Sequence, residues 1–227
     1  MNINKHLILL FSVLFFLFAV SVSSGCFRKN ESDVKSVVRN ELDQLKNLDS
    51  ETTQKYIPYT ELFPDATENT DLTDEINETF SLFFRKFNYK ISDVIIGTAN
   101  HSATVSVKLT TIDSKVLARD FKAELLRTQI TESAQAQKGN IKDSSRSLEA
   151  HYLILNHLLN TNDYDTAETD CNIQLVNTGN DKKEKWKIQR TNSLEDDLVG
   201  GLIADLADPE ILSPEDTLTV YLDTLQK

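Results

Sequence analysis

The chain has 227 residues, of which 24 are Lys or Arg and 35 are Asp or Glu, so its net charge at pH 7 is −11. Strong negative charge disfavours nucleic acid as a partner, because affinity there comes from neutralising phosphates with Lys and Arg. The length is enough for one good-sized domain or two small ones.

The first 25 residues have the features of a secretory signal peptide. Lys5 precedes an unbroken apolar run from Leu7 to Val22, and no acidic residue precedes Cys26. A charged start, a short apolar stretch and small residues at its end are typical of such a signal. Removal of residues 1–25 takes away Lys5 and no acid, which leaves a net charge of −12. An uncleaved anchor helix is the alternative, because the run is at the short end of what spans a bilayer.

Ser23, Ser24, Gly25 and Cys26 end the apolar run and resemble the bacterial lipobox, in which small residues precede a Cys. Ser23 stands where the lipobox usually has Leu. The resemblance implies cleavage before Cys26 and a diacylglyceryl group on its thiol. Two acyl chains give stable anchoring to a membrane. We therefore expect a lipoprotein that carries fatty acids such as palmitate on Cys26 and is held on the extracytoplasmic face of the cell membrane. The alternative to a lipoprotein signal is an ordinary cleaved signal peptide, in which Cys26 is present by coincidence and is not modified.

A long helix is expected to follow a tether of residues 26–31. Ser32 can cap its N-terminus, and Asp33 lies in the first turn, where the helix dipole favours an anion. Its apolar residues fall on one stripe: Val34, Val37, Val38, Leu42, Leu45 and Leu48. Residues 49–72 carry two prolines and many Thr and Asp, and are expected to be mostly loop.

A second helix is expected over residues 73–87. Its apolar residues recur at helical spacing: Ile76, Phe80, Phe83, Phe84 and Phe87. We interpret the Phe stripe as core, with a ligand-binding face as the alternative.

The apolar pattern then changes to a period of two. Residues 89–96 and 103–110 are expected to form two antiparallel strands around a turn at 97–100. The second strand alternates apolar with polar residues, which is typical of a strand with one wet face.

Two helices and a second hairpin follow. Asp113 caps a helix expected to reach Lys138, and a further helix covers residues 144–160. Strands are expected at 169–175 and 186–188, joined by a loop at 177–183.

The C-terminal segment is expected to be helical in two pieces. Leu194, Leu198, Leu202 and Leu206 are spaced by four, with Gly200-Gly201 weakening the middle. Ser213-Pro214 starts the last helix, with Leu218, Tyr221, Leu222 and Leu225 on one face. Residues 32–227 are thus expected to form a single α+β domain with a helical C-terminal extension.

The element order resembles the cystatin-like and nuclear transport factor 2-like architecture, in which a curved antiparallel sheet packs against a long N-terminal helix. The chain also resembles uncharacterised lipoproteins of low-GC Gram-positive bacteria. That resemblance rests on the lipobox, the Ala103–Thr111 strand leading into the Asp113 helix, Lys185-Trp186-Lys187-Ile188 and Leu198-Val199-Gly200-Gly201-Leu202. It supplies no functional residues, and fold alone does not give function.

Histidine and cysteine give no catalytic or metal-binding pattern. His151 and His157 are six residues apart on one expected helix, so their rings point in different directions, whereas a zinc pair needs a spacing of three or four. His101 lies in a turn and is expected to be solvated. Cys171 falls on the apolar side of its strand, where a thiol is inert.

Polar residues on one strand face have two interpretations: Glu168, Asp170, Asn172 and Gln174, with Lys187 and Gln189 opposite. They are either the solvent face of the sheet, which we favour, or the polar lining of a pocket with carboxylates acting as acid or base.

The acids near the C-terminus lack the spacing of a calcium loop: Glu195, Asp196, Asp197, Asp205 and Asp208. They are expected on helix surfaces and at helix starts. Gly200-Gly201 has no phosphate-loop context and is expected to allow close packing or a break. Trp186 is expected to be a core anchor.

We therefore expect no catalytic residues, no cofactor and no metal, and three functional hypotheses remain. The first is a non-enzymatic interaction or scaffold module held at the membrane through Cys26. The second is a protein that binds a small molecule or peptide between helix and sheet. The third is a nuclear transport factor 2-like enzyme, which needs a His/Asp or Tyr/Asp pair in that space. A filled helix–sheet space with an exposed apolar patch favours the first hypothesis, and an open polar cavity favours the others.

Overall fold

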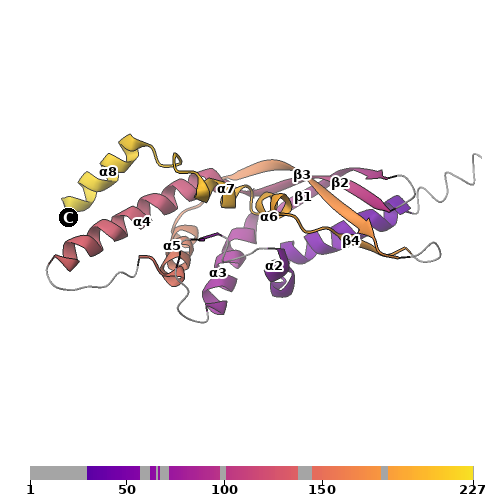
Figure 1. Ribbon diagram of the computed structural model, residues 1–227, viewed down its shortest axis with the longest axis horizontal. Helices are drawn as coiled ribbons and strands as arrows, with labels where there is room; N and C mark the ends of the chain where they lie inside the picture. Colours follow the sequence, from indigo (N-terminus) through magenta and orange to yellow (C-terminus); the bar gives the residue numbers. More distant parts are fainter. Residues whose placement is uncertain are drawn as a thin grey trace, which may run out of the picture.

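The computed structural model describes residues 30–56, 62–64, 66, 72–97, 101–137, 145–179 and 184–226. A helix covers residues 30–46. The labelled elements follow in chain order: α2 (Ser50–Tyr56), α3 (Thr73–Phe83), the 3-10 turn η1 (Phe84–Lys86), β1 (Asn88–Ile96), β2 (Ser102–Ile112), α4 (Ser114–Ala136), α5 (Leu148–Thr161), β3 (Thr166–Asn177), β4 (Trp186–Ile188), α6 (Asn192–Leu198), α7 (Leu202–Ala207) and α8 (Pro214–Leu225). The molecule is elongated, with the sheet at one end and α4, α5 and α8 toward the other (Figure 1).

The expected α+β class with an antiparallel sheet is confirmed. Both hairpins join into one four-stranded sheet of order β1-β2-β3-β4, in which each neighbouring pair is antiparallel. Ser92 is left unpaired between Ile91 and Asp93, so a bulge lies in the edge strand β1. The alternation of β2 and β3 divides the sheet into an apolar inner face and a polar outer face.

The helix of residues 30–46 packs on the inner face of the sheet. Its N-terminal end is held by Asn30, whose Nδ2 donates to Glu184 Oε1 at 2.9 Å just before β4. Its C-terminal end is held by Lys46, which donates to Asn88 Oδ1 at 2.9 Å at the start of β1. The space between helix and sheet is filled by buried apolar side chains: Val34, Val38, Leu42, Leu45, Val105, Val107, Leu109, Ile173 and Leu175.

The phenylalanine stripe is core, as expected. Phe80, Phe83, Phe84 and Phe87 are all buried, and the rings of Phe84 and Phe87 meet edge to face at 5.3 Å. α3 ends earlier than the expected residue 87, because the chain tightens into η1 at Phe84 and is extended at Phe87. A buried hydrogen bond of 2.5 Å from Thr79 Oγ1 to Asn156 Oδ1 joins α3 to α5.

Capping side chains set the starts of four helices, and two of these caps, Asp113 and Ser213, are the expected ones. Asp113 accepts hydrogen bonds from the backbone of Lys115 and Val116 at the start of α4, and Ser213 accepts from Asp216 at the start of α8. Ser147 and Thr191, which the sequence did not single out as caps, do the same for α5 and α6, so α5 begins at Leu148 and not at the expected residue 144. These oxygens satisfy backbone N–H groups that have no partner inside the helix.

Two further local expectations are wrong, and a third is incomplete. Ser32 does not cap the first helix, because Asn30 and Glu31 already belong to it and Glu31 pairs with Lys35 at 2.7 Å. Leu48 leaves the apolar stripe, because the helix ends at residue 46 and Leu48 adopts a left-handed φ of 62°. The expected loop after residue 49 contains α2, whose first turn is capped by Asp49 through Thr52 N at 2.8 Å.

The signal peptide and Cys26 lie outside the described residues. Within the ranges that the structure does describe, no helix combines the length and apolar character needed to cross a membrane.

Candidate functional site

Helix α8 exposes its apolar face. Leu218, Tyr221, Leu222 and Leu225 are 58%, 48%, 48% and 56% exposed, whereas Val220 is only 5% exposed. The four exposed residues follow the i, i+3, i+4, i+7 spacing of one helical stripe, which we call the α8 stripe. Large apolar patches on a soluble surface are a sign of an interaction site.

The stripe faces outward because α8 packs along α4 through a different side (Figure 1). Val220 is buried on that side, and Thr224 uses its hydroxyl to bond the carbonyl of Val220 at 2.7 Å. Ser213 and Pro214 fix the start of the helix, where Ser213 Oγ also donates to Asp216 Oδ2 at 2.7 Å. The helix is therefore well defined without burying its stripe.

The segment that carries the stripe is acidic throughout. Residues 191–226 contain nine Asp or Glu and no Lys or Arg. Glu215 lies two turns before Leu222 and borders the stripe on the exposed surface. The surface thus combines apolar area with a negative field, which favours a positively charged partner.

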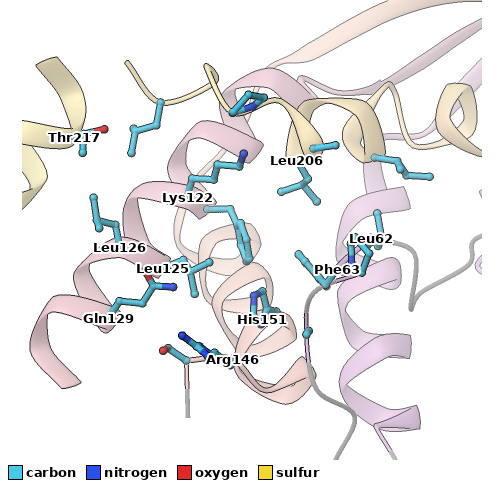
Figure 2. Close-up of a pocket in the computed structure, with 18 residues that line it drawn as sticks. Leu62, Phe63, Lys122, Leu125, Leu126, Gln129, Arg146, His151, Leu206 and Thr217 are labelled. Carbon is cyan, nitrogen blue, oxygen red and sulfur yellow. The ribbon is translucent and has the colours of Figure 1, made fainter. Parts of the chain in front are cut away.

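A second feature is a cavity of about 1000 Å³ between α4, α5, α7 and the residues Leu62, Phe63, Pro64 and Ala66. Of the 18 described residues that line it, twelve are apolar. Figure 2 shows Lys122, Leu125 and Gln129 projecting from α4 toward a space that Phe63 and His151 face from the other side. A predominantly apolar lining with a few polar groups is a feature that this cavity shares with small-molecule sites.

Aromatic rings form the wall of this cavity. The rings of Phe63 and Phe121 stack at 5.1 Å, and the His151 ring lies 4.8 Å from Phe63 and 5.6 Å from Phe121. His151 Nδ1 lies 2.7 Å from the carbonyl oxygen of Ser147, which can only accept, so Nδ1 carries the proton. Burial lowers the pKa of His151, so this wall is uncharged at neutral pH.

Two charged side chains, both basic, are found among the described residues of the cavity lining. They are Lys122 and Arg146, and the described lining residues include no Asp or Glu. Lys122 Nζ donates to the carbonyl oxygen of Asp208 at 2.6 Å. Two carboxylates next to the lining accept hydrogen bonds from the backbone: Asp208 Oδ1 from Glu210 N, and Glu132 Oε2 from Ser145 N. The described part of the lining therefore carries two basic side chains and no acidic one, although the net charge of the chain is −11.

The polar residues of β3 lie on the outer face of the sheet and not in a pocket. Glu168, Asp170, Asn172 and Gln174 are all exposed. Glu168 pairs with Lys108 at 3.2 Å, and Ser106 Oγ donates to Asn172 Oδ1 at 2.9 Å. The solvent-face interpretation is confirmed.

The histidines of α5 lie in different environments, as their spacing predicts. His151 is buried against the aromatic wall and His157 is exposed. His101 is exposed in its turn. Among the described residues, no group of three or more His, Cys, Asp or Glu is placed to hold a metal ion.

Cys171 is buried on the inner face of the sheet, as expected. Burial raises the pKa of its thiol, and the carboxylate of Asp197 on α6 raises it further and accepts a hydrogen bond from it. The thiol is thus held in its unreactive, protonated form.

Several of the C-terminal acidic residues form hydrogen bonds that hold neighbouring segments together. The expectation of a surface position is wrong for Glu195. This side chain is buried and accepts a hydrogen bond from Arg190 Nε. Asp196 Oδ1 accepts from Ile203 N at 2.9 Å at the start of α7, and Asp205 Oδ2 lies 2.7 Å from Ser114 Oγ.

Gly200 and Gly201 form the break between α6 and α7 with φ values of 68° and 91°, as the sequence predicts. Trp186 is buried at the start of β4, and its Nε1 donates to Glu184 Oε2 at 3.2 Å. Its expected role as a core anchor is confirmed.

Comparisons with protein-family models, with curated proteins and with solved structures find no match to the chain.

Proposed function

We propose that the chain is a membrane-anchored extracytoplasmic lipoprotein that acts as an interaction module and presents the α8 stripe to a protein partner. The observation that carries this proposal is the outward-facing apolar side of a well-capped helix. The partner would carry an apolar groove with a basic rim, because an amphipathic helix docks through its apolar stripe and the surrounding segment is acidic.

The position of the stripe suits this role. Three residues separate Cys26 from Asn30, and Asn30 is held beside Glu184 at the sheet end of the molecule. α8 lies at the opposite end (Figure 1). A lipid on Cys26 would therefore hold the sheet end near the membrane and leave α8 directed away from it.

The acidic segment also argues against two other occupants. A second copy would bring two segments with nine acids each into contact, and like charges across an interface are unfavourable. An anionic membrane surface would be repelled for the same reason.

We also propose a cystatin-like or nuclear transport factor 2-like arrangement for the sheet and first helix. The support is the long helix laid along the inner face of an antiparallel sheet. The space between them is filled by aliphatic side chains, which favours an interaction module over binding or catalysis at that place.

The test compares Leu222→Glu with Ile95→Glu in the full-length protein. Ile95 is a matched control, because it is 62% exposed on the outer side of the sheet. Both changes should leave the free energy of unfolding within about 0.5 kcal/mol, since they alter exposed positions. In gently solubilised membranes, the wild type and Ile95→Glu should migrate in a larger complex that Leu222→Glu has lost.

The loss should correspond to at least about thirtyfold weaker binding, as expected for a hot-spot residue. The wild-type complex should also weaken at high salt, because screening reduces the attraction to a basic rim. A Leu222→Glu protein that retains the complex would contradict the proposal, as would a complex made of two copies of this chain.

A further inference from the structure

We propose that the cavity between α4, α5 and α7 binds a single-chain amphiphile, with its anionic head at Lys122 and its apolar chain against Phe63 and Phe121. This inference does not depend on the α8 stripe or on the partner proposed for it. It rests on the size, lining and charge of the cavity itself.

The shape and lining favour an apolar chain. The volume of about 1000 Å³ is at the upper end of the range for small-molecule sites, about 300–1000 Å³. Leu125 lies one turn after Phe121 on α4 and lines the cavity together with the stacked Phe63–Phe121 pair. His151 continues that wall as a neutral ring, because its Nδ1 proton is used by the Ser147 carbonyl and burial disfavours a second proton.

The charge favours an anionic head. Lys122 uses one of its three N–H protons on the carbonyl of Asp208. No other acceptor for this ammonium group is found among the described residues. Arg146 is the second cation on the lining. A carboxylate or phosphate at Lys122 would gain charge-assisted hydrogen bonds that an uncharged head cannot make.

The test uses the full-length protein in nanodiscs of phosphatidylcholine, a lipid with no net charge. A fatty acid carrying a photoactivatable group in its chain is added to the purified protein, irradiated, and mapped by peptide mass spectrometry. We expect the label on peptides that line the cavity, from α4, α5, α7 or the stretch around Phe63, with excess unlabelled fatty acid competing it away. Label spread evenly over the chain, or confined to other elements, would overturn the proposal.

The head group is tested by competitors of equal chain length. A fatty alcohol should compete at least about tenfold more weakly than the fatty acid, since it cannot pair with a cation. A fatty acid that outcompetes an alkyl phosphate identifies a carboxylate head, and the reverse order identifies a phosphate monoester; either result supports an anionic amphiphile. Equal competition by the alcohol and the acid would overturn the proposal.

Two variants complete the test. Lys122→Met keeps the length of the stem and removes the charge, so labelling should fall about tenfold and the preference for acid over alcohol should disappear. Lys115→Met, on an exposed part of the same helix, should label like the wild type. A Lys122→Met protein that labels and discriminates like the wild type would overturn the assignment of the head group.

Discussion

Gly200 lies directly against the side chain of Thr111 on the inner face of the sheet. A Cβ at position 200 would be 2.2 Å from Thr111 Oγ1 and 3.1 Å from its Cβ, and the backbone there has a φ of 68°. This contact seats the turn between α6 and α7 on β2, and Ser114 at the start of α4 donates a hydrogen bond of 2.6 Å to the carbonyl oxygen of Gly200. The turn is therefore fixed to the sheet at a point where only glycine fits.

The contact predicts different effects at the two glycines. Gly200→Ala should lower the free energy of unfolding by about 2–4 kcal/mol, because it adds a steric clash to a left-handed backbone. Gly201→Ala should cost only about 1–2 kcal/mol, because its φ is also positive but the nearest atom is 3.7 Å away. Denaturant unfolding measures both. Thr111→Ala should recover part of the Gly200→Ala loss, and an absence of recovery would show that the clash is not the cause.

The Arg190–Glu195 pair predicts a strong dependence on both partners. Glu195 is 5% exposed and Arg190 is 47% exposed, so Arg190→Met leaves a buried carboxylate without its partner and should cost about 2–3 kcal/mol. Glu195→Met in the same chain removes the buried charge and should restore most of that stability. A double-mutant cycle by chemical denaturation checks the coupling, and additive effects would contradict it.

His151 predicts a loss of stability in mild acid. Its pKa in the folded protein is lower than the ordinary value of 6.5 because of burial, so below pH 6.5 the unfolded chain takes up a proton that the folded protein refuses. The free energy of unfolding should therefore fall as the pH drops through 6.5, by at most about 1.4 kcal/mol per pH unit, until the folded pKa is reached.

Unfolding at pH 7.5 and pH 5.5 checks this sign. The difference between the two pH values should be larger for the wild type than for His151→Gln, which does not titrate but keeps a donor for the Ser147 carbonyl. Equal differences for the two proteins would show that His151 contributes nothing to the pH dependence.

The lipid on Cys26 predicts a specific mass. Protein extracted from membranes should begin at Cys26 and carry a diacylglyceryl group, whereas Cys26→Ser should lack the lipid and keep its signal peptide. Intact-mass spectrometry with N-terminal peptide mapping checks both. A wild-type chain cleaved at another residue, with an unmodified Cys26, would contradict the lipoprotein assignment.

The fold class and most of the elements were predictable from local signals. The alternation of apolar and polar residues over 103–110 predicts β2 and its solvent-exposed face. Asp113 and Ser213 predict the starts of α4 and α8. α2 could not be predicted in the same way, because it is short and buries Thr52 and Thr53 rather than an apolar stripe. Its start is marked by a local signal, because Asp49 caps the first turn through Thr52, and Tyr56 at its end is buried.

The candidate sites were less accessible to prediction. Helical spacing identifies the α8 stripe from Leu218 to Leu225, but the same spacing is typical of a buried face, and only the packing of α8 through Val220 turns the stripe outward. The cavity is formed by segments far apart in the sequence, so no local pattern could place Phe63 beside Lys122 and His151. Likewise, Glu195 looks like a surface acid until Arg190 is seen to cover it.

The most direct test of the central claim is photo-cross-linking in intact cells, with benzoylphenylalanine at position 222 of the full-length protein and, in a separate chain, at Asn172 on the exposed outer face of the sheet. The account predicts a cross-link to one protein of defined mass from position 222 and none from position 172. That cross-link should disappear when Leu218 and Leu225 are replaced by Asp. Equal cross-linking from both positions, or none from position 222, would contradict the claim that the α8 stripe is an interaction surface.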